Sequence, residues 1–126
     1  MTEAPRDEPG DGRRYDLEER TFFFAQRVRA FVKTLPRTVC NFEDVKQTVR
    51  SSGSIGANYV EANEALGKKD CLLRLRTSRK ESKECRYWLR LLDTGTEPTI
   101  EKERGCLIQE STELLRIFSA IIDKSQ

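Results

Sequence analysis

Apolar residues recur along most of the chain at alternating intervals of three and four positions, which is the period of one buried face of an α-helix. Four such segments follow one another, at residues 16–35, 41–66, 69–93 and 98–123. No stretch between them alternates apolar and polar residues as a half-buried β-strand would. The pattern therefore predicts an all-α protein with four helices.

The ends of these segments carry residues typical of helix termini. Pro36 stops the first segment, because proline lacks the backbone N–H that a helix interior needs. Asn41 is predicted to be the N-cap of the second segment, and Gly67 is predicted to end it. Pro98 suits the first turn of the fourth segment. Because the connections are short, we expect an antiparallel, up-down four-helix bundle.

Small residues occupy the middle of the apolar faces, where large side chains would normally fill a core. Such residues allow helices to approach closely, and a serine hydroxyl can bond to a carbonyl one turn back. We therefore expect a narrow waist between two ends that are filled by larger residues. The small residues are Ser52, Gly56, Ser78, Ser82 and Ser111.

The length of 126 residues suits one domain. Residues 1–15 are acidic, rich in proline and glycine, and have almost nothing to bury, so they predict a disordered leader before a single domain at 16–126. No segment reaches the roughly 18 consecutive apolar residues of a membrane span, and the leader lacks the apolar stretch of a signal peptide. A cytoplasmic location is expected.

Catalytic and metal chemistry is poorly supported by the composition. The sequence contains no histidine, which is the commonest general base and metal ligand. The four cysteines lack C-x-x-C spacing and are expected to act as small apolar residues. Salt-bridged or solvated glutamates are favoured over a di-metal carboxylate site for three Glu-x-x-Glu pairs, Glu61/Glu64, Glu81/Glu84 and Glu110/Glu113. We therefore expect no cofactor, no metal and no enzyme activity.

Positive charge is concentrated in one segment, although the whole chain has a net charge of only +2. Residues 68–93 hold nine Lys and Arg against four Asp and Glu. A basic stripe that contains one aromatic residue suits a phosphate backbone. The alternative is a solvated helix face that pairs with glutamates nearby. Spacing of four and three predicts one outward stripe of Arg76, Lys80, Lys83, Tyr87 and Arg90, with Arg79 and Arg86 beside it.

Several large apolar residues do not fit the predicted core faces. Phe22 and Phe23 adjoin Phe24, and three consecutive side chains of a helix cannot all face one core. Trp88 also lies off the apolar face of its segment. We expect these residues to be exposed or buried between subunits, which favours self-association.

Residues 50–62 read RSSGSIGANYVEA, and residues 68–70, 79–81 and 87–92 read KKD, RKE and YWLRLL. These stretches resemble the signatures of the four helix bundle protein family, also called the 23S rRNA intervening-sequence protein family. The resemblance implies an antiparallel four-helix protomer, commonly assembled into a homopentameric ring, and bacterial genes within 23S rRNA intervening sequences. A related branch resembles accessory proteins of diversity-generating retroelements, which work with a reverse transcriptase and bind nucleic acid. The family resemblance implies no catalytic activity.

The residues that match the family pattern are Arg50, Ser54, Asn58, Glu61, Arg79, Lys80, Glu81 and Trp88. Gly67 and Cys71 depart from it, and both make side chains smaller at the turn between the second and third segments. Because buried charges persist only when paired, we expect a polar network that joins two helices or two protomers. Its predicted members are Asn58, Glu61, Arg79 and Glu81.

Taken with the charged stripe, the resemblance predicts a homo-oligomeric adaptor that binds structured RNA and has no enzyme activity. The alternative is a protein–protein scaffold whose partner, for example a reverse transcriptase, docks on the ring or on Phe22, Phe23 and Trp88. The residues predicted to bind nucleic acid are Arg76, Arg79, Lys80, Lys83, Arg86 and Arg90.

Overall fold

The computed structural model describes residues 13–126, which form four α-helices and, within that range, no strand. The helices are α1 (Arg13–Val32), α2 (Val39–Asn63), α3 (Lys68–Leu91) and α4 (Pro98–Ser125). The predicted all-α class with four helices is confirmed. Helix α1 begins at Arg13 rather than at residue 16, and residues 1–12 of the predicted leader lie outside the described residues.

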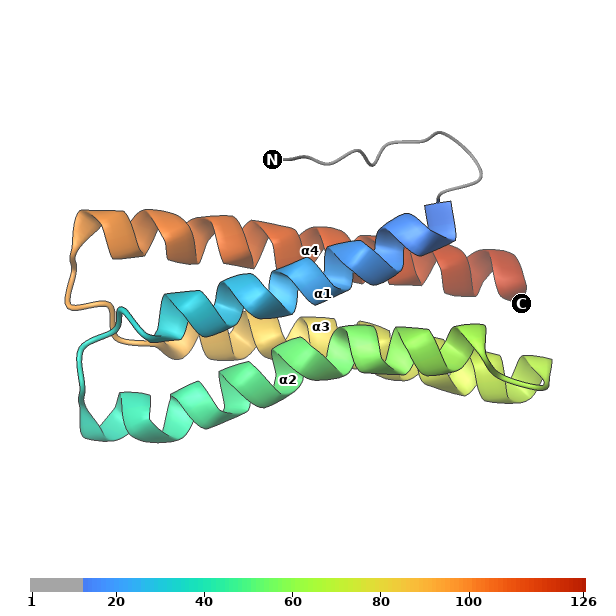
Figure 1. The fold of residues 1–126 in the computed structure, drawn as a ribbon, viewed down its shortest axis with the longest axis horizontal. Coiled ribbons are helices and arrows are strands. Elements are labelled where there is room, and N and C mark those ends of the chain that lie inside the picture. Colours follow the sequence, from blue (N-terminus) through green and yellow to red (C-terminus); the bar gives the residue numbers. More distant parts are fainter. Residues whose placement is uncertain (1–12) are drawn as a thin grey trace.

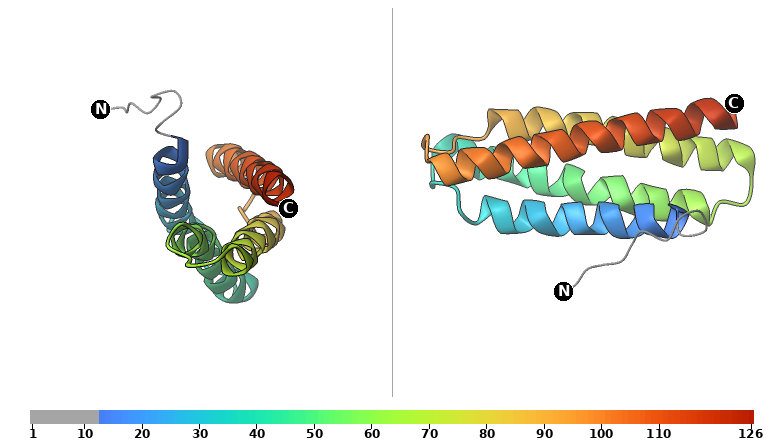
Figure 2. Two further views of the ribbon diagram at one scale, coloured as in Figure 1. Left: turned by 90° about the vertical axis from the view of Figure 1, so that its right-hand side faces the viewer. Right: turned by 90° about the horizontal axis from the view of Figure 1, so that it is seen from above.

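The helices lie side by side along one long axis, and the chain reverses its direction at each connection (Figure 1). Helix α1 packs against α2 and, more narrowly, against α4, while α3 packs closely against both α2 and α4. Helices α1 and α3 are therefore diagonally opposite, as the end-on view in Figure 2 shows. A ligand or partner on the outer face of α1 would thus leave the outer face of α3 free.

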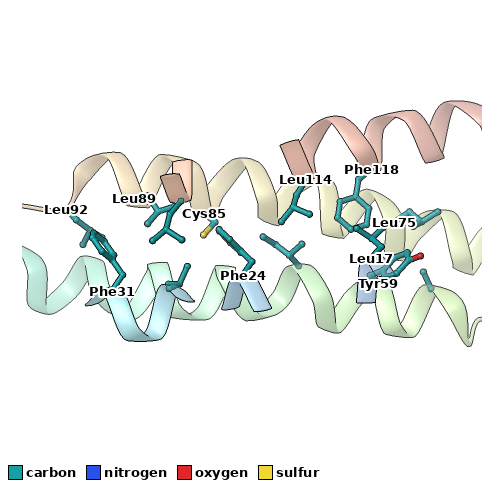
Figure 3. Packing of buried hydrophobic residues seen from close by; sticks show 14 of the residues in the cluster. Leu17, Phe24, Phe31, Tyr59, Leu75, Cys85, Leu89, Leu92, Leu114 and Phe118 are labelled. Carbon is teal, nitrogen blue, oxygen red and sulfur yellow. The ribbon is translucent and has the colours of Figure 1, made fainter. Parts of the chain in front are cut away.

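Most apolar residues at the predicted spacing are buried between the helices (Figure 3). Phe24 of α1, Cys85 and Leu89 of α3 and Leu114 of α4 are almost fully enclosed. Tyr59 meets Phe118 edge to face, with ring centroids 5.6 Å apart. A strict seven-residue repeat through Leu107 and Leu114 predicts Ile121 as the next buried residue of α4, but Ile122 is buried and Ile121 is only partly buried.

Hydroxyl groups fill the waist of the structure, and each is satisfied by a carbonyl. Ser52 and Ser111 donate to carbonyls of their own helices, and Ser78 of α3 donates to the carbonyl of Ile55 of α2 at 2.8 Å. A β-carbon at Gly56 would lie 2.7 Å from the Thr21 hydroxyl oxygen, so α1 and α2 meet where only glycine fits. Buried hydroxyls that are all bonded cost the fold little.

Asn41 does not cap α2 as predicted. The N-cap is Thr38, whose hydroxyl accepts a hydrogen bond from the Asn41 backbone N–H at 3.1 Å. The side chain of Asn41 is buried and donates to the carbonyls of Pro36 and Asp93, and it accepts from the Asp93 N–H. Asn41 therefore ties the α1–α2 connection to the α3–α4 connection.

Two other predicted helix ends have different outcomes. Gly67 does not end α2, whose C-cap is Glu64, but has extended backbone angles at the N-cap of α3. Pro98 occupies the first turn of α4 as predicted, and the Glu97 side chain caps that helix by accepting from the Ile100 N–H at 3.0 Å.

Candidate nucleic-acid interface on helix α3

The two glutamates of α3 contact an arginine of α2. Glu81 is buried, and its carboxylate oxygens lie 3.3 and 3.4 Å from Nη1 of Arg50 on α2. Nη2 of the same arginine lies 3.5 Å from Glu84. The two glutamates that could have neutralised the basic stripe are therefore engaged by an arginine of α2.

Two of the basic residues of α3 contact neutral acceptors at α4 and its C-terminal end. Arg86 donates to the Thr112 hydroxyl at 3.3 Å, and Arg76 donates to the Gln126 side-chain oxygen at 2.7 Å. Lys80, Lys83 and Arg90 are exposed, and Arg79 is half-buried. Among residues 13–126, none of these six cations forms an ion pair. Their charge is therefore not cancelled locally.

An aromatic pair lies within this basic face, between Lys83 and Arg90. Tyr87 is 54% exposed and follows Lys83 by one helical turn, while its neighbour Trp88 is half-buried. The two rings are in T-shaped contact, with centroids 5.4 Å apart and planes at 78°. Trp88, which was predicted to lie off the core, thus supports the position of Tyr87.

Helix α4 adds a cation that the spacing of residues on α3 could not predict. Arg116 is exposed and lies one turn beyond Thr112, the residue that Arg86 contacts. Helices α3 and α4 run in opposite directions (Figure 1). A residue one turn later in the sequence of α4 is therefore level with a residue one turn earlier in the sequence of α3. Arg116 therefore lies near the level of Lys83 and extends the basic face across two helices.

The predicted polar network is arranged differently within one chain. Asn58 accepts from Arg74 at 3.1 Å and donates to the carbonyl of Ser54, which is half-buried, at 2.9 Å. Glu61 is exposed, and neither it nor Arg79 makes a hydrogen bond or ion pair to another residue within the described range. Arg79 cannot join Glu81, because two positions on a helix differ by about 200° around its axis. A role for Glu61 and Arg79 between protomers stays a prediction.

The other Glu-x-x-Glu pairs help to decide between ion pairing and metal binding. Arg20 of α1 binds Glu110 of α4 at 2.7 and 2.9 Å and reaches Glu113 at 3.2 Å. These hydrogen bonds raise the pKa of the Arg20 guanidinium, so it stays charged. Two of the three pairs thus hold an arginine, and residues 13–126 contain no cluster of three or more potential metal ligands.

Large apolar side chains are exposed on α1 and α2, and Leu73 and Leu91 are exposed on α3 itself. Phe22 and Phe23 are 60% and 61% exposed, as the surplus of apolar residues predicted. Val39, Phe42 and Val60 of α2 are exposed as well. None of the helices in the described part of the chain is both long enough and apolar enough to cross a bilayer.

The fold defines a small all-α protein of four packed helices. Residues 13–120 match the profile of the family described as 23S rRNA-intervening sequence protein, and the chain belongs to this family. The chain is also similar to a crystal structure from Bacteroides thetaiotaomicron, described as a protein of unknown function from the S23 ribosomal protein family. The two are 32% identical, the match covers 87% of this chain and 97% of that chain, and the TM-score is 0.75. The comparison with curated proteins finds no match.

Proposed function

We propose that this protein is a non-enzymatic, homo-oligomeric adaptor that binds RNA through the basic face of α3. The observation that supports this most strongly is the sorting of charge on α3. Its glutamates bind Arg50 of α2, while its basic residues lack ion pairs within residues 13–126. The face consists of Arg76, Arg79, Lys80, Lys83, Arg86 and Arg90, with Arg116 of α4 beside them.

The dimensions of this face suit a phosphate backbone. Arg76 and Arg90 are 14 positions apart, which corresponds to about 21 Å along a helix. Phosphates of one strand advance about 3.4 Å along the axis of a DNA duplex, so a nucleic acid would place on the order of six phosphates within that length. Lysine and arginine at such phosphates release counterions, which makes affinity fall steeply with salt. The description of the family names 23S rRNA, and RNA is the ligand that we propose.

Self-association is the second part of the proposal. The exposed Phe22 and Phe23 lie on α1, which is diagonally opposite α3. A subunit contact on α1 would therefore leave the basic face accessible, and a ring, with five copies expected from the family resemblance, would present several such faces at once. Several linked sites raise the overall affinity for one RNA without new contacts at any single site.

Fluorescence anisotropy with a labelled structured RNA tests the proposal. The wild-type protein should bind at low salt and weaken steeply as salt increases. A variant with three neutralised cations of α3, Lys80→Gln, Lys83→Gln and Arg90→Gln, should show a salt slope smaller by about 2–3, because each phosphate contact contributes about 0.7–0.9.

A matched variant controls for net charge. It neutralises three exposed cations away from α3 and α4, which are Lys33, Arg37 and Lys46. This control should bind almost as tightly as the wild type. Equal losses in the two triple variants would contradict a specific basic face.

A protein–protein scaffold is the second candidate, and the exposed phenylalanines of α1 favour it. In that case the partner would dock on Phe22, Phe23 or the half-buried Trp88, and a reverse transcriptase is one such partner. Absence of RNA binding at low salt would support this candidate, since electrostatic attraction is strongest there.

A further inference from the structure

Tyr87 is the exposed aromatic residue of the basic face. Tyr87 is 54% exposed, and its hydroxyl makes no hydrogen bond to another residue in the described part of the chain. It lies four positions after Lys83 and three before Arg90. An exposed aromatic ring between two cations without ion pairs is the arrangement that single-stranded nucleic acid uses, with bases stacked on rings and phosphates bound by cations.

The contact with Trp88 orients Tyr87 without enclosing it. In a T-shaped pair the edge of one ring meets a face of the other, and the planes here are at 78°. Such a contact covers at most one of the two faces of the Tyr87 ring. At least one face is therefore left for stacking. The half-buried Trp88 restricts the Tyr87 ring before binding, so less conformational entropy is lost when a flat partner stacks on the ring.

We infer that Tyr87 stacks against an unpaired base, so that the preferred ligand of the basic face is RNA with a bulge, loop or single strand rather than a continuous duplex. This inference rests on the proposed function. Bases inside a duplex are already stacked on their neighbours, whereas an unpaired base can turn its flat face to an aromatic side chain.

The positions of the neighbouring cations fit this arrangement. Lys83 lies about 6 Å and Arg90 about 4.5 Å from Tyr87 along the helix axis, in opposite directions. Both side chains are long and exposed, so each can reach a phosphate that flanks the stacked nucleotide. One nucleotide would then be held by its base at the centre and by its backbone on each side.

Two RNA probes with the same number of phosphates separate stacking from charge attraction. One is a fully paired duplex, and the other carries an unpaired 2-aminopurine in a bulge, whose fluorescence falls when it stacks. The full-length wild-type protein should bind the bulged probe more tightly and quench its fluorescence. Tyr87→Leu should weaken binding of the bulged probe by about 5- to 100-fold, the usual effect of one lost stacked base.

Controls make the result specific to the aromatic ring. Tyr87→Leu should change duplex binding less than about 2-fold and leave the salt slope unaltered, because it removes no charge. Tyr87→Phe keeps the ring and should retain both affinity and quenching. Since Tyr87 is exposed, both variants are expected to fold, and circular dichroism and thermal melting would test this independently.

Three outcomes would overturn the inference. Equal affinity of wild type and Tyr87→Leu for the bulged probe, with the steep salt dependence kept, would refute stacking but leave the proposed function standing. A change of subunit mass in Tyr87→Leu, measured by native mass spectrometry, would place the ring in a protein contact instead. Failure of the wild type to bind either probe at low salt would refute the proposed function and the inference together.

Discussion

Replacing Asn41 with alanine is expected to lower the free energy of unfolding by about 2–4 kcal/mol. The Asn41 side chain is only 3% exposed. It donates to the Pro36 carbonyl at 2.9 Å and to the Asp93 carbonyl at 2.8 Å, and it accepts from the Asp93 N–H at 2.9 Å. Each hydrogen bond contributes about 1 kcal/mol net, so the loss of all three costs about 3 kcal/mol.

Two further effects decide where in that range the value falls. The backbone groups of Pro36 and Asp93 lose their partners in the variant, which adds a penalty if water cannot reach them. Asp93 is exposed, so water entry should limit this penalty. The N-cap bond from the Asn41 N–H to Thr38 survives, because it involves only the backbone of residue 41.

Urea denaturation followed by circular dichroism measures the change, with wild type and variant at the same protein concentration because association would affect both midpoints. A thermal midpoint lower by about 10 °C should accompany it. Asn63→Ala is the matched control, since Asn63 is half-buried and makes one side-chain bond, to Glu18 at 2.7 Å. An Asn41→Ala effect no larger than that of Asn63→Ala would refute the idea that Asn41 joins the two connections.

Two further predictions concern the packing and titration of the core. Gly56→Ala should destabilise the fold by about 1–2 kcal/mol in urea denaturation, because its new β-carbon would press on Thr21. Gly105→Ala, with nothing within 4 Å, should instead stabilise it by up to about 1 kcal/mol, and destabilisation of both would contradict the close contact. Burial raises the pKa of the Cys85 thiol from 9.0 to about 12. The folded state therefore holds the proton more tightly, and stability should fall between pH 9 and about 12, by at most about 1.4 kcal/mol per pH unit. Cys85→Ala should not show this loss of stability at high pH. Identical pH profiles of the free energy of unfolding for wild type and Cys85→Ala would contradict the prediction.

Local pattern was enough to predict the helices but not the connections between them. The period of apolar residues reports which face of each helix is buried, and most of that prediction is confirmed. Asn41 was assigned as a cap because capping is a local rule. Its actual partner, Asp93, is 52 residues away, and no local signal points to it.

The end of α4 shows where a repeating pattern loses accuracy. A seven-residue repeat assumes 3.5 residues per turn, whereas a straight helix has about 3.6, so the buried face drifts by about 20° per heptad. Helix α4 is 28 residues long, and the drift accumulates until Ile122 rather than Ile121 faces the core.

The sequence predicted the part of the candidate site that lies on α3, but not the contacts of α3 with its neighbours. The spacing of cations on α3 was visible in the sequence, but their partners depend on which neighbour each side of the helix faces. The pairing of Glu81 with Arg50, rather than with cations of its own helix, required the packing of α2 on α3. Arg116 was missed because it belongs to α4 and reaches the basic face only through the register of the two helices.

Lysine footprinting with and without bound RNA tests the central claim most directly. Lys80 and Lys83 on α3 and Lys33 and Lys46 elsewhere are all exposed, so an acylating reagent should modify each of them in the free protein. We predict that saturating RNA slows modification of Lys80 and Lys83 and leaves Lys33 and Lys46 unchanged. Unchanged reactivity of Lys80 and Lys83 while RNA is bound, or equal protection of all four lysines, would contradict RNA binding by the basic face of α3.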